Sequence, residues 1–312
     1  MSDEGRLTPF PEARPPHVPD AVARRSPWVY GFLAVALIDL SLVVRSGLPP
    51  ATDIESIVVA IISTIPAVVA PLLGVALFNR DRNAWRTMPL LAFGVVLLTL
   101  GSLLTAVSSV VIGFLIALTP TDPDPFTPAV TAFGVLRGLL SVFAVLYVAA
   151  GLAAARRMPR SRVERPLLVW LVALGVISAV LSIGAFLAEG IASSPSLLVQ
   201  VGLGIVLSLA STFAWAYLAA ITVGGAVAGE SPQRAWRLAA IAVGVLIVSP
   251  LVSTAIVAVT IAAPANPLLW VVGVATALAW LLLLASFVMG VPSPAPATVA
   301  TADPPGAMLP GS

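Results

Sequence analysis

The chain contains no cysteine and no lysine, and its only histidine is His17. Without cysteine it can form no disulfide, no thiolate metal site and no acylated cysteine anchor. Without lysine it cannot hold a cofactor such as retinal through a Schiff base. His17 lies in a proline-rich N-terminal stretch, which excludes haem ligation by paired histidines and the HExxH type of zinc site. We therefore expect no metal and no cofactor.

Charged residues are also scarce, at 10% of the chain, whereas soluble domains carry roughly 25%. Hydrophobic residues make up 59%, and the mean hydropathy is +1.05. Neither nucleotide-binding pattern, G-x-x-x-x-G-K-[ST] or G-x-G-x-x-G, is present. The Asp-Pro-Asp-Pro run at 122–125 superficially resembles the D-x-D metal site of glycosyltransferases, but its alternating prolines favour a rigid turn. The sequence predicts a membrane protein that is not an enzyme.

The apolar residues are gathered into eight segments with short connections. About 20 such residues cross the hydrocarbon core of a bilayer, and each segment reaches that length. The predicted fold class is an all-α integral membrane protein, an eight-span helical bundle over 28–290, with seven or nine spans as less favoured counts. The spans are predicted at 28–48, 54–78, 88–118, 129–155, 167–188, 196–226, 238–262 and 268–290. The lipid bilayer is then the principal partner.

All 16 positions that carry lysine or arginine are arginine, a bias typical of high-GC bacterial coding. Fourteen of the 16 lie in the N-terminal tail or in the connections 79–87, 156–166 and 227–237. The intervening connections carry acidic residues and only one arginine, Arg45. Because cytoplasmic loops carry the excess of basic residues, we predict a plasma-membrane protein with both termini in the cytoplasm. The arginines act as a topology signal, so no nucleic-acid partner is expected.

Residues 1–27 and 291–312 each contain six prolines and little periodic apolar pattern. Such segments cannot bury enough apolar surface to offset the entropy lost on ordering. Both tails are predicted to be disordered and cytoplasmic. A proline-rich ligand for a partner domain is the alternative interpretation of either tail.

A weak internal repeat divides the spans into two sets of four. The tripeptide Ala-Trp-Arg occurs at 84–86 and again at 235–237, each time ten residues after a glycine. Two parallel four-helix halves, 28–155 and 167–290, would be related by an axis along the membrane normal. The alternative is that tryptophan and arginine anchor helix ends independently at the membrane interface.

Asp39 and Arg137 are the ionisable residues that lie well inside predicted spans. A charge at mid-span costs roughly 2.5–3.5 kcal/mol on insertion scales, so such residues usually face the protein interior and pair. At about 1.5 Å per residue, both lie at a similar depth, which predicts an Asp39–Arg137 ion pair. The alternatives are Arg45 as the partner of Asp39, or an Arg137 side chain that extends to the interface. The pair could be structural or could belong to a proton or substrate pathway.

Polar residues also recur at helical spacing on the spans 88–118 and 196–226. The two stripes comprise Ser102, Thr105, Ser108 and Ser109 on the first span, and Gln200, Ser208, Ser211 and Thr212 on the second. They could line a polar cavity, or they could hydrogen-bond neighbouring helices as packing contacts. Pro66, Pro71 and Pro250 interrupt two other spans, a feature that some transporter sites share.

Two functions fit these features. The first is a small-solute permease, or the membrane subunit of a transport system, with Asp39, Arg137 and the stripes around a water-reachable cavity. The second is a structural or accessory membrane protein whose polar residues only pack helices. Other membrane subunits or a second copy of the chain could be partners in either case. A cavity that converges on Asp39 and Arg137 would favour transport, and a dry closed bundle would favour the accessory role.

Overall fold

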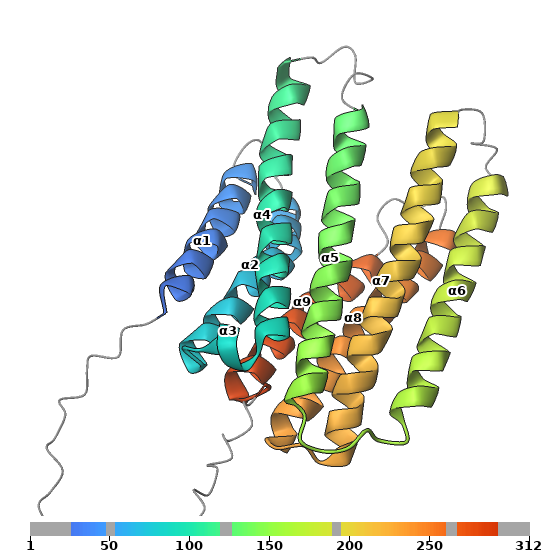
Figure 1. Ribbon diagram of the computed structural model, residues 1–312. Helices are drawn as coiled ribbons and strands as arrows, with labels where there is room; N and C mark the ends of the chain where they lie inside the picture. The colour runs from blue at the N-terminus through green and yellow to red at the C-terminus, as the bar shows by residue number, and fades with distance from the viewer. Residues whose placement is uncertain (1–25, 48–53, 119–126, 189–194, 260–266, 293–312) are drawn as a thin grey trace, which may run out of the picture.

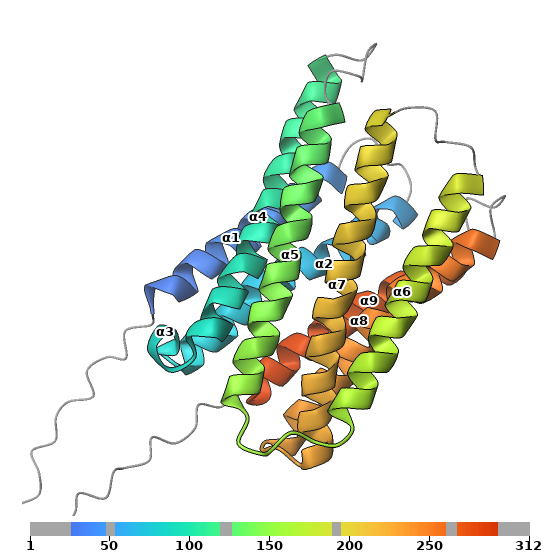
Figure 2. The same cartoon turned by 45° about the vertical axis from the view of Figure 1, so that its right-hand side comes forward.

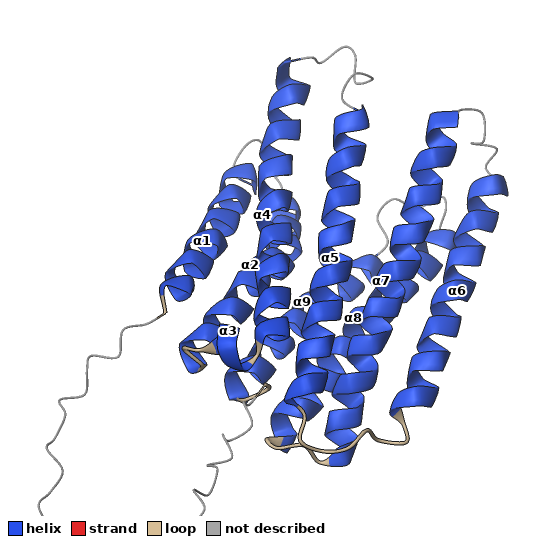
Figure 3. Cartoon of the chain, viewed as in Figure 1, coloured by secondary structure: helices blue, strands red, loops and turns tan. Residues whose placement is uncertain are grey.

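The computed structural model describes residues 26–47, 54–118, 127–188, 195–259 and 267–292, and within these ranges the secondary structure is entirely helical (Figures 1 and 3). The helices are α1 (Pro27–Gly47), α2 (Ile54–Arg80), α3 (Ala84–Thr87), α4 (Pro89–Leu118), α5 (Thr127–Ala155), α6 (Glu164–Ala188), α7 (Pro195–Ala228), α8 (Gln233–Val259) and α9 (Pro267–Met289). The predicted all-helical class is thereby confirmed. Of the tails predicted to be disordered, 1–27 and 291–312, residues 1–25 and 293–312 lie outside the described ranges. The inner ends of both tails differ from the prediction, because Pro27 begins α1 and Val291 is buried.

Every predicted span coincides with a helix to within a few residues. Six of these helices, α2, α4, α5, α7, α8 and α9, are long and apolar enough to cross a membrane over the residues described. These six helices indicate a multi-pass membrane protein. The count of eight spans stays a prediction, because the described parts of α1 and α6 fall short of that length criterion.

The short helix α3 was not predicted from the sequence, although it contains the first Ala-Trp-Arg tripeptide. Its turn is held by Asp81, whose carboxylate accepts a hydrogen bond from the Asn83 amide (2.9 Å) and another from the Thr87 hydroxyl. Pro89 then begins α4, as proline commonly does at a first helical turn. Residues 81–88 thus form a compact turn between two long helices.

Six of the long helices pack in a closed order, with each helix against the next: α2, α4, α5, α7, α8, α9 and back to α2. Helix α1 packs on α2 and α4, and α6 packs on α7. Figures 1 and 2 show α4, α5, α7 and α6 as one layer in front of α2, α8 and α9. Helix α4 therefore separates α1 from α5.

Among the described side chains, the hydrophobic core lies at one end of the bundle. This end carries the loops 81–83, 156–163 and 229–232 and is here termed the arginine-rich end. Every buried residue of the core cluster lies in the half of its helix nearest this end. The cluster includes Val69, Leu73, Leu77, Phe78, Leu91, Val95, Val145, Leu152, Leu218, Trp236, Val243 and Leu283. Towards the opposite end, fewer of the described side chains are buried.

Candidate functional site

Asp39 is buried between three helices, with 3% of its surface exposed. The Ser102 hydroxyl from α4 is hydrogen-bonded to the Asp39 carboxyl on α1, and the same hydroxyl oxygen lies 2.7 Å from the Ala67 carbonyl oxygen on α2. Ser102 therefore joins α1, α2 and α4 at one point. The second carboxyl oxygen of Asp39, Oδ1, is buried and has no hydrogen-bond partner among the described residues.

Pro71 explains why the Ala67 carbonyl needs a partner from another helix. In an α-helix this carbonyl would accept the amide hydrogen four residues later, and proline has none. Ser102 takes the place of that missing donor. It has a single hydroxyl proton. Ser102 can therefore donate to the Ala67 carbonyl or to the Asp39 carboxyl, but not to both at the same time.

The structure does not form the predicted Asp39–Arg137 ion pair. Arg137 is exposed on α5, which packs on α4 and α7, whereas Asp39 lies on α1, which packs on α2 and α4. The two residues have similar depths, but α4 stands between their helices. The contact with Ser102 replaces the predicted pair. The alternative partner, Arg45, has a side chain outside the described part of the structure.

The described residues of the two polar stripes line none of the cavities found between the described helices. On α4, Thr105 donates to the Gly101 carbonyl at 2.8 Å and Ser108 to the Thr105 carbonyl at 2.9 Å, both within their own helix. On α7, Thr212 donates to the Ser208 carbonyl at 2.9 Å. Ser102 also bonds outside its own helix, to Asp39 on α1 and to the Ala67 carbonyl on α2. Bonding between neighbouring helices, one of the two roles predicted for the stripes, is therefore seen at Ser102.

The remaining stripe residues add little to a site. Ser208 is exposed and Ser211 is half-buried on α7. Thr212 packs closely against Gly175 on α6. A Cβ atom added to Gly175 would lie 2.0 Å from the methyl carbon of Thr212. Ser109 and Gln200 lie in α4 and α7, but their side chains are outside the described part of the structure.

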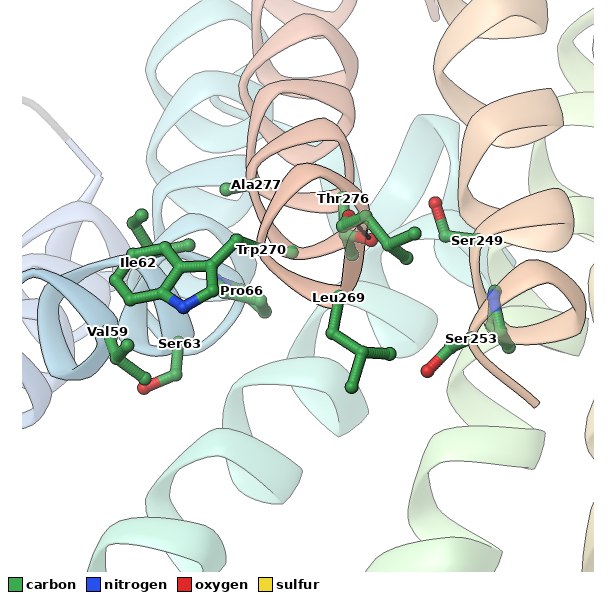
Figure 4. A pocket seen from close by; sticks show the side chains of 13 residues that line it. Val59, Ile62, Ser63, Pro66, Ser249, Ser253, Leu269, Trp270, Thr276 and Ala277 are labelled. Atoms are coloured by element: carbon green, nitrogen blue, oxygen red, sulfur yellow. Dashed lines mark hydrogen bonds between the residues drawn. The ribbon is translucent and has the colours of Figure 1, made fainter. Parts of the chain in front are cut away.

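A cavity of about 550 Å³ lies elsewhere, between α2, α8 and α9 (Figure 4). It lies in the halves of these helices away from the arginine-rich end. Its lining includes Ser63, Pro66, Ser249, Pro250, Ser253, Trp270 and Thr276. The volume falls within the roughly 300–1,000 Å³ of small-molecule sites. Both Pro66 and Pro250, singled out separately in the sequence, line this one cavity.

The cavity wall is apolar with a few hydroxyl groups. Ser63 donates to the Ala60 carbonyl at 2.9 Å, and Thr276 to the Val272 carbonyl at 2.8 Å. Pro66 leaves the Ile62 carbonyl without its usual helical donor, and Ile62 also lines the cavity. None of the described lining residues is charged. Such a wall suits an uncharged solute that can exchange a few hydrogen bonds.

Two polar contacts fasten the helices at the arginine-rich end. Arg80, the last residue of α2, donates to the carbonyls of Phe287 at 3.3 Å and Gly290 at 2.9 Å, at the end of α9. Glu230, which follows α7 and is 3% exposed, accepts the amides of Arg157 at 2.9 Å and Met158 at 3.0 Å, directly after α5. These contacts connect α2 to α9 and α7 to α5.

The chain matches no known family model, no curated protein and no solved structure. Within the described residues there is also no group of three or more His, Cys, Asp or Glu side chains that could hold a metal ion. The candidate site is therefore defined by the cavity between α2, α8 and α9 and by the Asp39–Ser102 contact.

Proposed function

We propose that this protein is a small-solute permease, alone or as the membrane subunit of a transport system. The observation that carries the proposal is the cavity of about 550 Å³ at Pro66 and Pro250. Interrupted membrane helices form the binding sites of many transporters. The packed core lies at the other end of the same helices. This arrangement is that of a bundle closed at its arginine-rich end.

The packing order supports a duplication of the two halves. Suppose that α1, α2, α4 and α5 correspond to α6, α7, α8 and α9. The contacts α1–α2, α2–α4 and α4–α5 of the first half then have counterparts in α6–α7, α7–α8 and α8–α9. The contact between α5 and α7 corresponds in the same way to that between α9 and α2. A two-fold axis along the membrane normal produces this pattern, as in transporters built from parallel repeats.

The two contacts at the arginine-rich end fit the same correspondence. Arg80 ends α2 and binds the end of α9, whereas Glu230 follows α7 and binds the chain after α5. Arg80 and Glu230 thus lie at equivalent positions of the two halves and carry charges of opposite sign. In a permease that works by rocking of its halves, these two contacts would break when the cavity opens to the cytoplasm, where we place the arginine-rich end.

Because the chain contains no cysteine, an introduced cysteine is its single thiol and can be used to test whether water reaches the cavity. Ser253→Cys places a single thiol in the cavity wall, and a membrane-impermeant thiosulfonate added outside intact cells would label it if water fills the cavity. Val252→Cys is the matched control, since Val252 is the next residue on α8 and is 40% exposed without lining the cavity. Labelling of Ser253→Cys alone is expected.

The transport proposal then requires a solute. A library of uncharged solutes would be screened for protection of Ser253→Cys from labelling, and each protecting solute for uptake into proteoliposomes. Equal labelling of both thiols, or of neither, would remove the water-filled cavity on which the proposal rests. A labelled cavity with no uptake of any protecting solute would leave a binding protein rather than a permease.

The alternative is a structural or accessory membrane protein. It is favoured by Ser102, whose hydroxyl links α4 to α1 and α2 as a packing contact. In this case the cavity is filled by lipid chains, and the thiol of Ser253→Cys stays unlabelled. The same experiment therefore separates the two functions.

A further inference from the structure

A second cavity, of about 340 Å³, lies at the arginine-rich end between α5, α6 and α7. Its polar wall is formed by Arg156, Arg160, Ser161, Glu164, Arg165 and Tyr217. Its apolar wall includes Leu168 on α6 and Ile221 on α7. The cavity thus has a positively charged mouth at the helix ends and an apolar floor towards the bundle.

The acidic residue of this cavity is already engaged. Glu164 forms an ion pair with Arg156 at 2.6 Å, with the two side chains 12% and 4% exposed, and its carboxylate also accepts the Ser161 amide at 2.7 Å. Arg160 and Arg165 are exposed, and in the described part of the chain they have no ion-pair partner. Two positive charges therefore remain uncompensated at the cavity.

Two buried polar atoms of the same wall lack partners. Arg156 Nε is a buried donor without a hydrogen-bond acceptor, and the Ser161 hydroxyl is buried without any hydrogen-bond partner in the described structure. Buried polar groups are nearly always satisfied in folded proteins. Both residues line the cavity, so a ligand with acceptor oxygens there would give these two groups hydrogen-bond partners.

We propose that this cavity binds a phosphate group, supplied by an anionic phospholipid of the adjoining leaflet. Guanidinium groups match the geometry and charge of phosphate oxygens. The end of a membrane-spanning helix lies at the depth of the headgroups, and basic pockets between membrane helices on the cytoplasmic side are suited to acidic headgroups. The apolar floor at Leu168 would receive the lipid beyond its phosphate. This inference is independent of the permease proposal.

The test uses the full chain in phosphatidylcholine nanodiscs with and without phosphatidylglycerol, and counts bound lipid by native mass spectrometry after release. Phosphatidylglycerol should remain bound to the wild type where phosphatidylcholine does not. Removing Arg160 and Arg165 together, as Arg160→Ala/Arg165→Ala, should weaken binding at least about tenfold, because charge-assisted hydrogen bonds to the phosphate are lost. Both side chains are exposed, so the variant is expected to fold.

The matched control is Arg234→Ala/Arg237→Ala, which removes the same charge from exposed positions at the α7–α8 connection. It should retain phosphatidylglycerol as the wild type does. Equal losses in the two double variants would show a nonspecific charge effect and overturn the proposal. In a further arm, inorganic phosphate is added to the phosphatidylcholine nanodiscs. If the protein retained this phosphate but not phosphatidylglycerol, the phosphate group would not come from a lipid, and the proposal would be overturned. Equal binding of both lipids would also refute it.

Discussion

The Ser102 hydroxyl oxygen lies 2.7 Å from the carbonyl oxygen of Ala67, on a neighbouring helix. This carbonyl lacks its usual donor because Pro71 stands four residues later in α2. A proline that would otherwise expose a polar group inside the bundle is thus compensated from α4. The same hydroxyl also holds Asp39 on α1. Ser102 is therefore the polar centre of the α1, α2 and α4 contact.

Ser102→Ala is expected to lower the free energy of unfolding by about 1–3 kcal/mol, because it leaves buried polar groups unpaired. In a Pro71→Ala background the loss should be smaller, since the new amide of residue 71 can donate to Ala67. The measurement is reversible unfolding in micelles over the double-mutant cycle. Ser108→Ala is the control, because Ser108 bonds to its own helix. Equal losses in both backgrounds would contradict the role assigned to Pro71.

Asp39 and Arg137 are expected to act independently. Asp39→Asn and Arg137→Gln should change the free energy of unfolding by amounts that add to within about 0.5 kcal/mol, as for residues without shared partners. The physical reason is the separation of α1 from α5 by α4. The same unfolding measurement on the two single variants and the double variant checks this. A coupling energy well above about 0.5 kcal/mol would show that the two side chains interact, as the ion pair predicted from their depth requires.

The predicted Asp39–Arg137 ion pair illustrates what could and could not be predicted from this sequence. Helix positions follow from apolar length, and depth follows from rise per residue, so both could be predicted. The lateral order of helices could not, because it depends on which helices pack side by side. For the same reason, Pro66 and Pro250 were recognised as interruptions, but their meeting in one cavity was not. Arg156 was noted only as a loop arginine, and its partner Glu164 and the buried Glu230 were not singled out.

Two glycines, Gly94 on α4 and Gly151 on α5, allow these two helices to pack closely. A Cβ atom added to Gly151 would lie 2.5 Å from the Leu91 amide nitrogen, and one added to Gly94 would lie 2.6 Å from that of Val148. Gly134 has open space instead. Gly151→Ala should therefore force the helices apart and cost about 1–3 kcal/mol through overpacking.

Gly134→Ala is the matched control on the same helix and should leave stability unchanged or slightly raised, because alanine favours helix. Both variants would be compared by thermal unfolding in detergent and by the yield of folded protein. If Gly151→Ala were as stable as Gly134→Ala, the α4–α5 contact would have to be looser than the structure gives.

Glu230 should control access to the loop 156–163. Its carboxylate accepts the amides of Arg157 and Met158 while it is 3% exposed, so Glu230→Ala leaves both donors without this partner. Hydrogen bonds to charged groups contribute about 1.5–3 kcal/mol each. Opening of the loop, and with it trypsin cleavage at its arginines, should rise by about tenfold or more, since limited proteolysis follows the open population.

Glu230→Gln retains a carbonyl oxygen as one acceptor and should give an intermediate cleavage rate. Cleavage after Arg82, in the turn between α2 and α4, is the internal control and should not change, because Glu230 bonds to Arg157 and Met158 in the other loop. A parallel rise at both loops would indicate general destabilisation. An unchanged rate at 156–163 would mean that Glu230 does not hold this loop, and would remove one of the two contacts that close the arginine-rich end.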